Sequence, residues 1–196
     1  MPSILWKRLD LEGHDACRIV ECDDGWDIAG NAVFDHQGDA ANLAYRLNCD
    51  RSWLSRKATI GGWIGSRDIH ILIDRAEDGH WYVNGEKNVD FRGLVDIDLG
   101  FTPASNTNAI RRMNLEKGRQ SESVAVWLDT EDWSVKALPQ VYRRLDANTY
   151  DYSSPLHEYH AELSVSEFGL VVEYPALWRM INCRSDLEEK GRGTGR

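Results

Sequence analysis

Residues 158–165 read Glu-Tyr-His-Ala-Glu-Leu-Ser-Val, and apolar and polar side chains alternate through this stretch without a break. Successive side chains of a β-strand point to opposite faces of a sheet. Tyr159, Ala161, Leu163 and Val165 would therefore share one face, with the polar residues on the other. The stretch predicts a strand with one buried and one exposed face.

The same period of two recurs along the chain. It appears at Leu43/Tyr45/Leu47, Ile69/Ile71/Ile73, Val95/Ile97/Leu99, Val124/Val126/Leu128 and Leu170/Val172/Tyr174. Polar turns separate the runs, and two of them (77–80 and 83–86) have the Asp-Gly or Asn-Gly composition of hairpins, because these residues accept a positive φ at low cost. We expect about ten to twelve strands. The predicted fold is all-β, a single antiparallel sheet curled into a spiral β-roll or open barrel with at most one or two short helices.

A chain of 196 residues usually forms one domain. We assign residues 1–185 to a single β-roll domain and residues 186–196 to a flexible C-terminal tail, because the end of the chain is rich in Gly and charge. The segment from Pro175 to about Lys190 leaves two readings open. It could form a helix that begins at Pro175, or it could continue the preceding strand.

Composition and charge disfavour several classes of partner. The formal net charge is −9, and no block of Lys and Arg occurs that could neutralise a phosphate backbone or an anionic membrane surface. The N-terminus lacks the pattern of a secretion signal, and no run of apolar residues is long enough to span a bilayer. We expect a cytoplasmic protein that binds no nucleic acid and has no membrane span. The four cysteines form no CxxC pair and are expected to be free thiols.

The strongest cluster of polar residues lies within residues 93–113. Asp96 and Asp98 would share one face of a strand, where they repel unless one is protonated or a cation intervenes. If Arg111 and Arg112 also lie on a strand, only one of them can meet these carboxylates, and a charge at Arg111 would need a carboxylate partner of its own. The cluster is either a binding wall for a polar headgroup or a network that fixes the local structure.

The intervening loop and the aromatic residues allow the same two readings. Asn106, Thr107 and their polar neighbours can close turns or hydrogen-bond to sugar hydroxyls. The chain has eight tryptophans and seven tyrosines, and flat aromatic faces suit sugar rings and apolar chains. Trp81 lies close to polar turns and is our aromatic candidate for the mouth of a cavity.

Motifs of the common enzyme classes do not occur. The spacing of His157 and His160 is one residue short of the H-E-x-x-H zinc motif, and the surrounding residues read as a strand. The sequence has no G-x-S-x-G elbow, no Walker A loop and no G-x-G-x-x-G motif. We therefore predict no metal site, no cofactor and no catalytic residue, and we expect a binding protein more than an enzyme.

The chain resembles the bacterial family called "Putative glycolipid-binding", long known as a domain of unknown function. The resemblance covers roughly residues 20–180. It rests on the motifs Gly93–Asp98, Thr102-Pro103, Ser105–Thr107, Ile110–Arg112, Gln140–Tyr142, Tyr150–Tyr152 and Gly169–Pro175. Ser105 and Ala109 depart from the Thr and Pro that are usual in the family. The resemblance implies a spiral β-roll, similar to the curled sheets of lipoprotein carriers that cradle acyl chains. It implies no established reaction.

These observations predict a protein that holds a glycolipid or another amphiphile on the concave face of a curled sheet, without catalysis. One alternative is a hydrolase that acts on a glycoside or ester through Asp96 and Asp98. Another is a protein-interaction module that uses exposed strand edges. The predicted ligand-binding residues are Asp96, Asp98, Asn106, Thr107, Arg111, Arg112, Gln140, Tyr142 and Trp81.

Overall fold

The computed structural model describes residues 1–184, so the tail predicted for residues 186–196 lies outside the described residues. Within residues 1–184 the strands form one sheet of 15 strands in the order β8-β7-β6-β5-β4-β3-β2-β1-β15-β14-β13-β12-β11-β10-β9. The sheet is curled and does not close into a barrel. The prediction of a curled, mainly β protein is confirmed.

The strands are β1 (Ser3–Arg8), β2 (Gly13–Cys22), β3 (Gly25–His36), β4 (Asp39–Asp50), β5 (Ser55–Ile64), β6 (Arg67–Arg75), β7 (Trp81–Val83), β8 (Glu86–Asn88), β9 (Asp96–Leu99), β10 (Gln120–Leu128), β11 (Val135–Arg144), β12 (Thr149–Ser154), β13 (Tyr159–Val165), β14 (Val171–Tyr174) and β15 (Trp178–Arg184). Between β9 and β10 lie the 3-10 turn η1 (Pro103–Ser105) and the helix α1 (Asn106–Met113), and a second 3-10 turn, η2 (Pro155–His157), follows β12.

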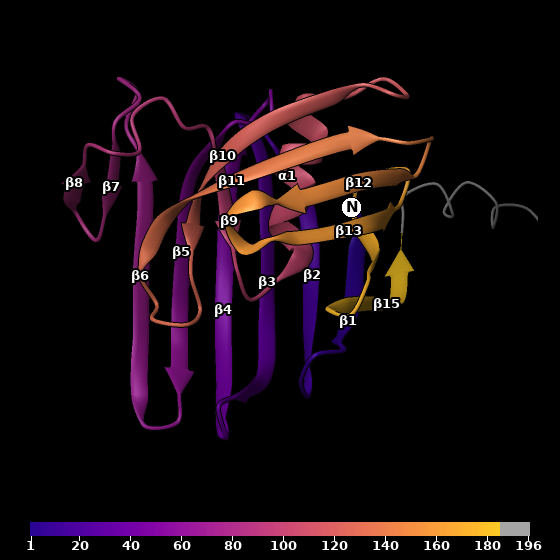
Figure 1. Ribbon diagram of the computed structural model, residues 1–196. Coiled ribbons are helices and arrows are strands. Elements are labelled where there is room, and N and C mark those ends of the chain that lie inside the picture. Colours follow the sequence, from indigo (N-terminus) through magenta and orange to yellow (C-terminus); the bar gives the residue numbers. More distant parts are fainter. Residues whose placement is uncertain (185–196) are drawn as a thin grey trace, which may run out of the picture.

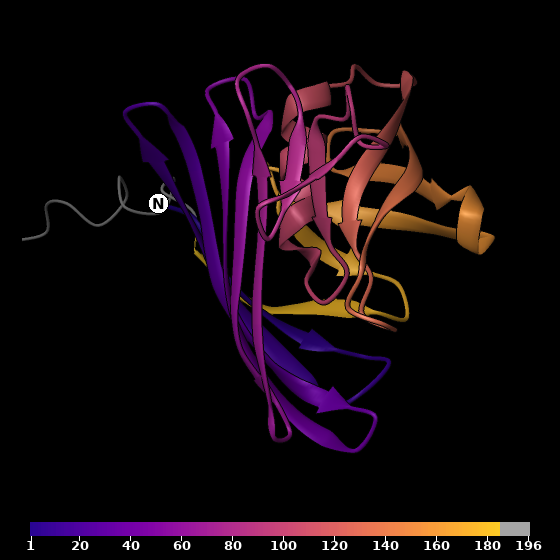
Figure 2. The same ribbon diagram turned by 90° about the vertical axis from the view of Figure 1, so that its left-hand side faces the viewer.

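The chain builds this sheet from two meanders. Strands β1 to β8 pair in order, the chain then crosses to β9 and α1, and strands β10 to β15 return until β15 pairs with β1. The long strands β2 to β6 form one layer, and β10 to β13 cross in front of them (Figure 1). The view from the side shows α1 between these two layers (Figure 2). One sheet therefore wraps around a central segment made of β9, η1 and α1.

The sheet is mostly antiparallel, as predicted, and contains one parallel pair of strands. Strands β9 and β10 pair in parallel, with Asp96 opposite Ala125, and the other strand pairs are antiparallel. A parallel pair needs a long crossover connection, and here the segment that contains η1 and α1 supplies it. The sheet also has more strands than we expected, because short strands such as β7 and β8 carry too little sequence for a period to be visible.

The alternation in the sequence predicts the buried face well. In β13, Ala161, Leu163 and Val165 are buried, while His160 and Glu162 are exposed. Both predicted hairpin turns are present as well. Asn84 and Gly85 have φ values of 51° and 85° in the turn between β7 and β8, which is the conformation that favours Asn-Gly.

The helix lies where we did not expect one. Residues 106–113 form α1, although this stretch reads as a loop, and residues 178–184 form strand β15, although a helix from Pro175 was one of the two readings. The strand reading is correct for β15 because β1 provides a hydrogen-bonding partner from the other end of the chain. In the described residues no helix is long and apolar enough to cross a membrane.

The inside of the curl is largely filled by the chain itself. Ile97, Leu99, Phe101 and Ile110, from the central segment, belong to the same apolar core as Leu43 and its neighbours on the long strands. A wide, empty channel for acyl chains is therefore absent from the described part of the chain. Two pockets lie beside the central segment, within the described residues.

Ser55 joins the edge strand β9 to the middle of the sheet. Its amide donates to the Val95 carbonyl (2.9 Å), and its hydroxyl accepts from the Ile97 amide (3.1 Å) and the Asn108 side chain (3.0 Å). Ser55 is fully buried, so no water can replace these bonds. We call these bonds through Ser55 the seam between β5 and β9. The two strands do not pair with each other, so the seam connects them in place of a ladder and helps to hold the sheet in its curled form.

We expect Ser55→Ala to lower the free energy of unfolding by about 2 kcal/mol, because two buried donors lose their acceptor. The midpoint of urea denaturation, at an unchanged m-value, measures the loss. Ser66→Ala, in the exposed turn after β5, is the matched control. Equal midpoints for the two variants would mean that the seam does not contribute to stability.

Candidate functional site

Asp96, on β9, and Arg112, on α1, form an ion pair that is largely buried. The Arg112 guanidinium donates from Nε to Oδ1 (2.7 Å) and from Nη2 to Oδ2 (2.5 Å) of Asp96, and the Ser123 hydroxyl also donates to Oδ2 (2.5 Å). The Asp96 side chain is 1% exposed. Each of its oxygens already accepts a charged or hydroxyl donor, so Asp96 fixes the position of α1 against β9 and β10.

Asp98, two residues further along β9, has no cation within ion-pair distance among residues 1–184. Its Oδ1 accepts from the Ser105 hydroxyl (3.1 Å) and its Oδ2 from the Gln140 side-chain amide (2.6 Å). Burial raises the pKa of Asp98 to about 6; the two hydrogen bonds oppose this rise, and the charge of Asp96 adds to it. The two carboxylates therefore differ, since Asp96 is paired with a cation and Asp98 is held by neutral donors, with a raised pKa.

Other predicted residues surround these two carboxylates. The Asn106 side-chain amide donates to the Tyr142 hydroxyl (2.9 Å), and Gln140 also donates to the Tyr152 hydroxyl (3.0 Å). Thr107 is fully buried, and its hydroxyl has no hydrogen-bond partner within residues 1–184. Side-chain hydrogen bonds thus join two pairs of the predicted residues, Asp98 with Gln140 and Asn106 with Tyr142.

A pocket of about 250 Å³ opens beside Asp98, and we call it the Asp98 pocket. Asp98, Asn106, Trp127, Tyr152, Tyr159 and Trp178 are among its lining residues. The buried Ser154 hydroxyl also belongs to the lining and has no hydrogen-bond partner in the described residues. The pocket therefore combines aromatic walls with a carboxylate and a hydroxyl that can accept or donate further hydrogen bonds.

The aromatic walls come from several strands that the curl brings together. The Trp127 ring on β10 meets the His157 ring of η2 edge to face, with 5.1 Å between ring centroids. Gly100 makes room for Trp127, because a Cβ at this position would lie 2.9 Å from the indole Nε1. On the other side, Tyr152 packs against Tyr159 and Tyr174 with centroids 6.3 and 5.8 Å apart.

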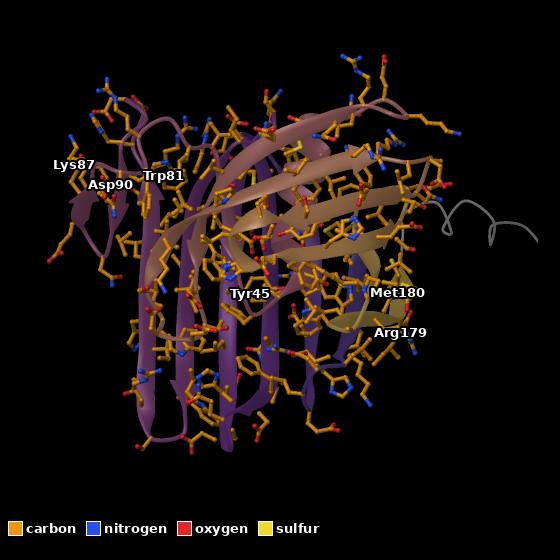
Figure 3. The ribbon with its side chains drawn as sticks, viewed as in Figure 1. Tyr45, Trp81, Lys87, Asp90, Arg179 and Met180 are labelled. Carbon is orange, nitrogen blue, oxygen red and sulfur yellow. The ribbon has the colours of Figure 1, made fainter. Side chains whose placement is uncertain are left out.

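Asp15 is a second buried carboxylate, and it accepts a hydrogen bond from Thr102, which lines the Asp98 pocket. The Thr102 and Tyr45 hydroxyls both donate to Oδ2 of Asp15, and Thr102 is also the N-cap of η1. Tyr45 lies in the middle of the long strands (Figure 3). Burial raises the pKa of Asp15 to about 6. This network ties η1 to strands β2 and β4, and so positions the residues that follow.

Of the nine predicted residues, Asp98 and Asn106 line the Asp98 pocket, whereas Arg111 and Arg112 line a different pocket and Trp81 lines neither. Trp81 is fully buried near the far edge of the sheet, where its indole donates to the Leu94 carbonyl (3.0 Å), and it lines neither this pocket nor the one beside Arg111 (Figure 3). Arg111 lies at the opposite end of α1, in a separate pocket lined by polar groups. The single site predicted from the sequence is therefore divided between the two ends of the helix.

The sequence analysis did not predict Asp15, Trp127, His157 or the tyrosines other than Tyr142 as ligand-binding residues. Trp127 carried a usable signal, because it alternates with the core residues Val126 and Leu128 and so had to face away from that core. Asp15 carried none, since its partners are 30 and 87 residues away.

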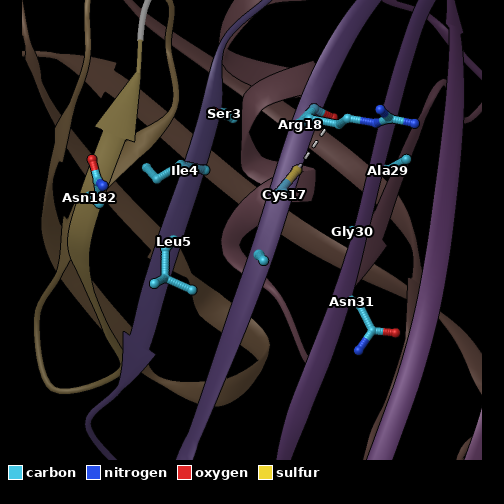
Figure 4. A pocket seen from close by; sticks show the side chains of 10 residues that line it. Ser3, Ile4, Leu5, Cys17, Arg18, Ala29, Gly30, Asn31 and Asn182 are labelled. Atoms are coloured by element: carbon cyan, nitrogen blue, oxygen red, sulfur yellow. Dashed lines mark hydrogen bonds between the residues drawn. The ribbon is translucent and has the colours of Figure 1, made fainter.

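A larger hollow of about 570 Å³ lies over strands β1 to β3 (Figure 4). It is lined mainly by small or apolar residues, including Leu5 and Ala29, on the face of the sheet turned away from α1. Arg18 is the charged residue of this lining. This hollow lacks the group of polar side chains found in the Asp98 pocket, so we do not assign the ligand to the hollow.

The chemistry of the Asp98 pocket is that of hydrogen bonding and ring stacking. No group of three or more potential metal ligands occurs within residues 1–184. Carboxylate, hydroxyl and amide groups next to flat aromatic faces suit a polyhydroxylated ligand, whose hydroxyls need acceptors and whose ring faces are apolar.

The sequence matches the family described as "Putative glycolipid-binding" over residues 3–180. A crystal structure of a DUF1089 family protein from Pseudomonas aeruginosa is similar in fold, with a TM-score of 0.76 and 30% sequence identity. The match covers 85% of this chain and 91% of the other. A comparison with curated proteins finds no match.

Proposed function

Because the chain belongs to the "Putative glycolipid-binding" family, we propose that it binds a glycolipid by its sugar headgroup in the Asp98 pocket, without catalysis. The cytoplasmic location expected from the sequence is part of this proposal. The proposal keeps the predicted class of ligand but moves the contact from a broad concave wall to one pocket.

The supporting observation is the state of Asp98. Its carboxylate is enclosed by neutral donors, has no cation within ion-pair distance in the described residues, and still borders the pocket. Keeping such a group buried is unfavourable for folding, and strongly perturbed carboxyls gather at functional sites. A sugar hydroxyl that donates to Asp98 would supply the hydrogen bond that water otherwise gives.

The size of the pocket favours the headgroup over the acyl chains. Sites that enclose a whole drug-sized ligand are usually about 300–1,000 Å³, whereas the Asp98 pocket has about 250 Å³. The core residues of the central segment occupy the rest of the curl. The acyl chains would therefore remain outside the pocket.

The alternative of a hydrolase that uses Asp96 and Asp98 gains no support from this geometry. Asp96 does not line the pocket and already accepts from Arg112 and Ser123. A pair of catalytic carboxylates must flank the bond to be broken, about 5 Å or more apart across the substrate. Here only one of the two reaches the pocket.

We expect Asp98→Asn and Trp127→Ala each to weaken binding of a short alkyl glycoside, such as octyl glucoside or octyl galactoside, by about tenfold or more. A hydrogen bond to a charged group contributes about 1.5–3 kcal/mol, and each 1.4 kcal/mol corresponds to about tenfold in affinity. Isothermal titration calorimetry below the critical micelle concentration measures the dissociation constants.

Trp63→Ala is the matched control, because Trp63 is 41% exposed on β5 and does not line the Asp98 pocket. Its affinity should equal that of the unchanged protein. Failure of all glycosides to bind, or equal binding by the Asp98 and Trp63 variants, would refute the proposal.

A further inference from the structure

A pocket of about 460 Å³ lies at the C-terminal end of α1, and we call it the Arg111 pocket. It is bordered by the turns between β4 and β5, β11 and β12, and β13 and β14. An eight-residue helix is about 12 Å long, so α1 separates this pocket from the Asp98 pocket. Four arginines and one glutamate line it: Arg51, Arg111, Arg112, Arg144 and Glu167.

Two aromatic rings hold the Arg111 guanidinium in place. Its Cζ lies 5.2 Å from the ring centroid of Trp53 and 4.8 Å from that of Phe168. Trp53 is itself stacked on Trp26, with centroids 4.6 Å apart. Stacking on aromatic faces leaves the edge of a guanidinium free to donate, so these contacts orient the group without using its hydrogen-bonding capacity.

Arg111 has no anionic partner in the described part of the chain. No carboxylate of residues 1–184 lies within ion-pair distance of it, and its buried Nε has no hydrogen-bond acceptor there. Burial lowers the pKa of Arg111, and the Tyr150 phenol opposes this effect in part. A partly buried cation of this kind is unfavourable unless something anionic meets it.

The other three arginines are already engaged. Arg112 is paired with Asp96, and Arg51 donates to the Asp23 carbonyl (2.7 Å). Arg144 donates to the carbonyls of Leu115, Asp146 and Ala147. They add positive charge to the pocket wall, while Arg111 retains the unused donors. A concentration of positive charge in a protein of net charge −9 is a local feature that favours an anion at this place.

Gly169 leaves the space that Arg111 occupies. Its φ is +95°, and a Cβ there would lie 3.3 Å from Cδ of Arg111. Hydroxyl groups of Ser52, Ser166 and Tyr150 also line the pocket and can donate to a ligand. The Ser166 hydroxyl accepts from the Leu170 amide (3.1 Å), which leaves its own hydrogen available.

We propose that the Arg111 pocket binds a phosphoryl group, carried either by a lipid headgroup or by a soluble phosphate ester. The planar guanidinium matches two oxygens of a phosphate. The hydroxyl donors beside it suit the additional oxygens that a phosphate has and a carboxylate lacks. This site is separate from the sugar site, and neither proposal depends on the other.

The test compares Arg111→Gln with Arg143→Gln, a variant with the same change in charge. Arg143 is half-exposed, pairs with Asp151 on the neighbouring strand and does not line the pocket. The probes are glycerol 3-phosphate, followed by calorimetry, and phosphatidylcholine vesicles with and without phosphatidic acid, followed by sedimentation. We expect Arg111→Gln to weaken binding of at least one phosphate probe by about tenfold or more, and Arg143→Gln to change it little.

Binding of glycerol 3-phosphate alone identifies a soluble ester, and binding that depends on phosphatidic acid identifies a lipid headgroup. Either result supports the proposal if it requires Arg111. Failure of the unchanged protein to bind either probe at millimolar phosphate, or equal binding by Arg111→Gln, overturns it. Arg111→Lys, which keeps the charge but loses the planar fork, gives an intermediate affinity and serves if the Gln variant does not fold. The alkyl glycosides carry no charge and these probes carry no sugar, so the two proposals fail independently.

Discussion

Arg112→Gln is expected to lower the free energy of unfolding by about 3–5 kcal/mol, because it leaves the buried Asp96 carboxylate without its cation. Asp96 is 1% exposed and accepts both parallel hydrogen bonds of the Arg112 guanidinium, so water cannot replace them. Only Ser123 would remain as a donor. Chemical denaturation at pH 7 measures the loss.

The neighbouring arginine provides the matched control. Arg111→Gln removes the same charge from the same helix but leaves no carboxylate without its cation. We therefore expect a change of about 1 kcal/mol or less, the scale of the contacts of Arg111 with two aromatic rings. The double variant Asp96→Asn/Arg112→Gln should recover part of the loss, since it also removes the unpaired carboxylate. Similar losses for Arg111→Gln and Arg112→Gln would contradict the assignment of the ion pair.

Asp98→Asn is expected to stabilise the protein relative to the unchanged chain by roughly 2 kcal/mol at pH 7, with little difference at pH 4. Burial raises the pKa of Asp98 from 3.8 to about 6 in the folded state. Between these values the folded state binds more protons than the unfolded state, so the contribution of Asp98 to stability falls as the pH rises. A shift of this size corresponds to at most about 3 kcal/mol, and the partial opening of the side chain to the pocket reduces it.

The measurement is the difference in unfolding free energy between Asp98→Asn and the unchanged protein at several pH values from 4 to 8. Using the difference removes the contributions of other groups, including Asp15, whose pKa is raised in the same direction. Asp68→Asn, at an exposed position, should show a constant difference. A difference for Asp98→Asn that does not grow between pH 4 and pH 7 would show that the carboxyl ionises freely in the folded protein.

The strands could be predicted because one face of the sheet is buried and the period of two is then imposed on the sequence. Helix α1 could not, since it begins Asn106-Thr107-Asn108, residues with weak helix propensity, and buries them. Their partners Tyr142 and Ser55 come from distant strands. The local signals were present but short: Thr102 is the N-cap of η1, Pro103 follows it, and Asn114 ends α1 in a left-handed conformation.

The polar residues of the site were found because charged and amide side chains stand out in an apolar stretch. Their division between two pockets was not, because it follows from the direction of α1, which carries Asn106 towards one pocket and Arg111 towards the other. The aromatic walls escaped notice for a related reason. Trp127, Tyr152 and Tyr159 come from three strands, and only the curl of the sheet places them around one space.

Strand β1 lies between β2 and β15, so its second neighbour is synthesised long after the first. Until β15 leaves the ribosome, one side of β1 has open amide and carbonyl groups that another chain could pair with. Completion of the sheet therefore requires contacts between residues that are 170 or more positions apart. Such distant contacts form slowly, and the newly made chain is exposed to aggregation until they form.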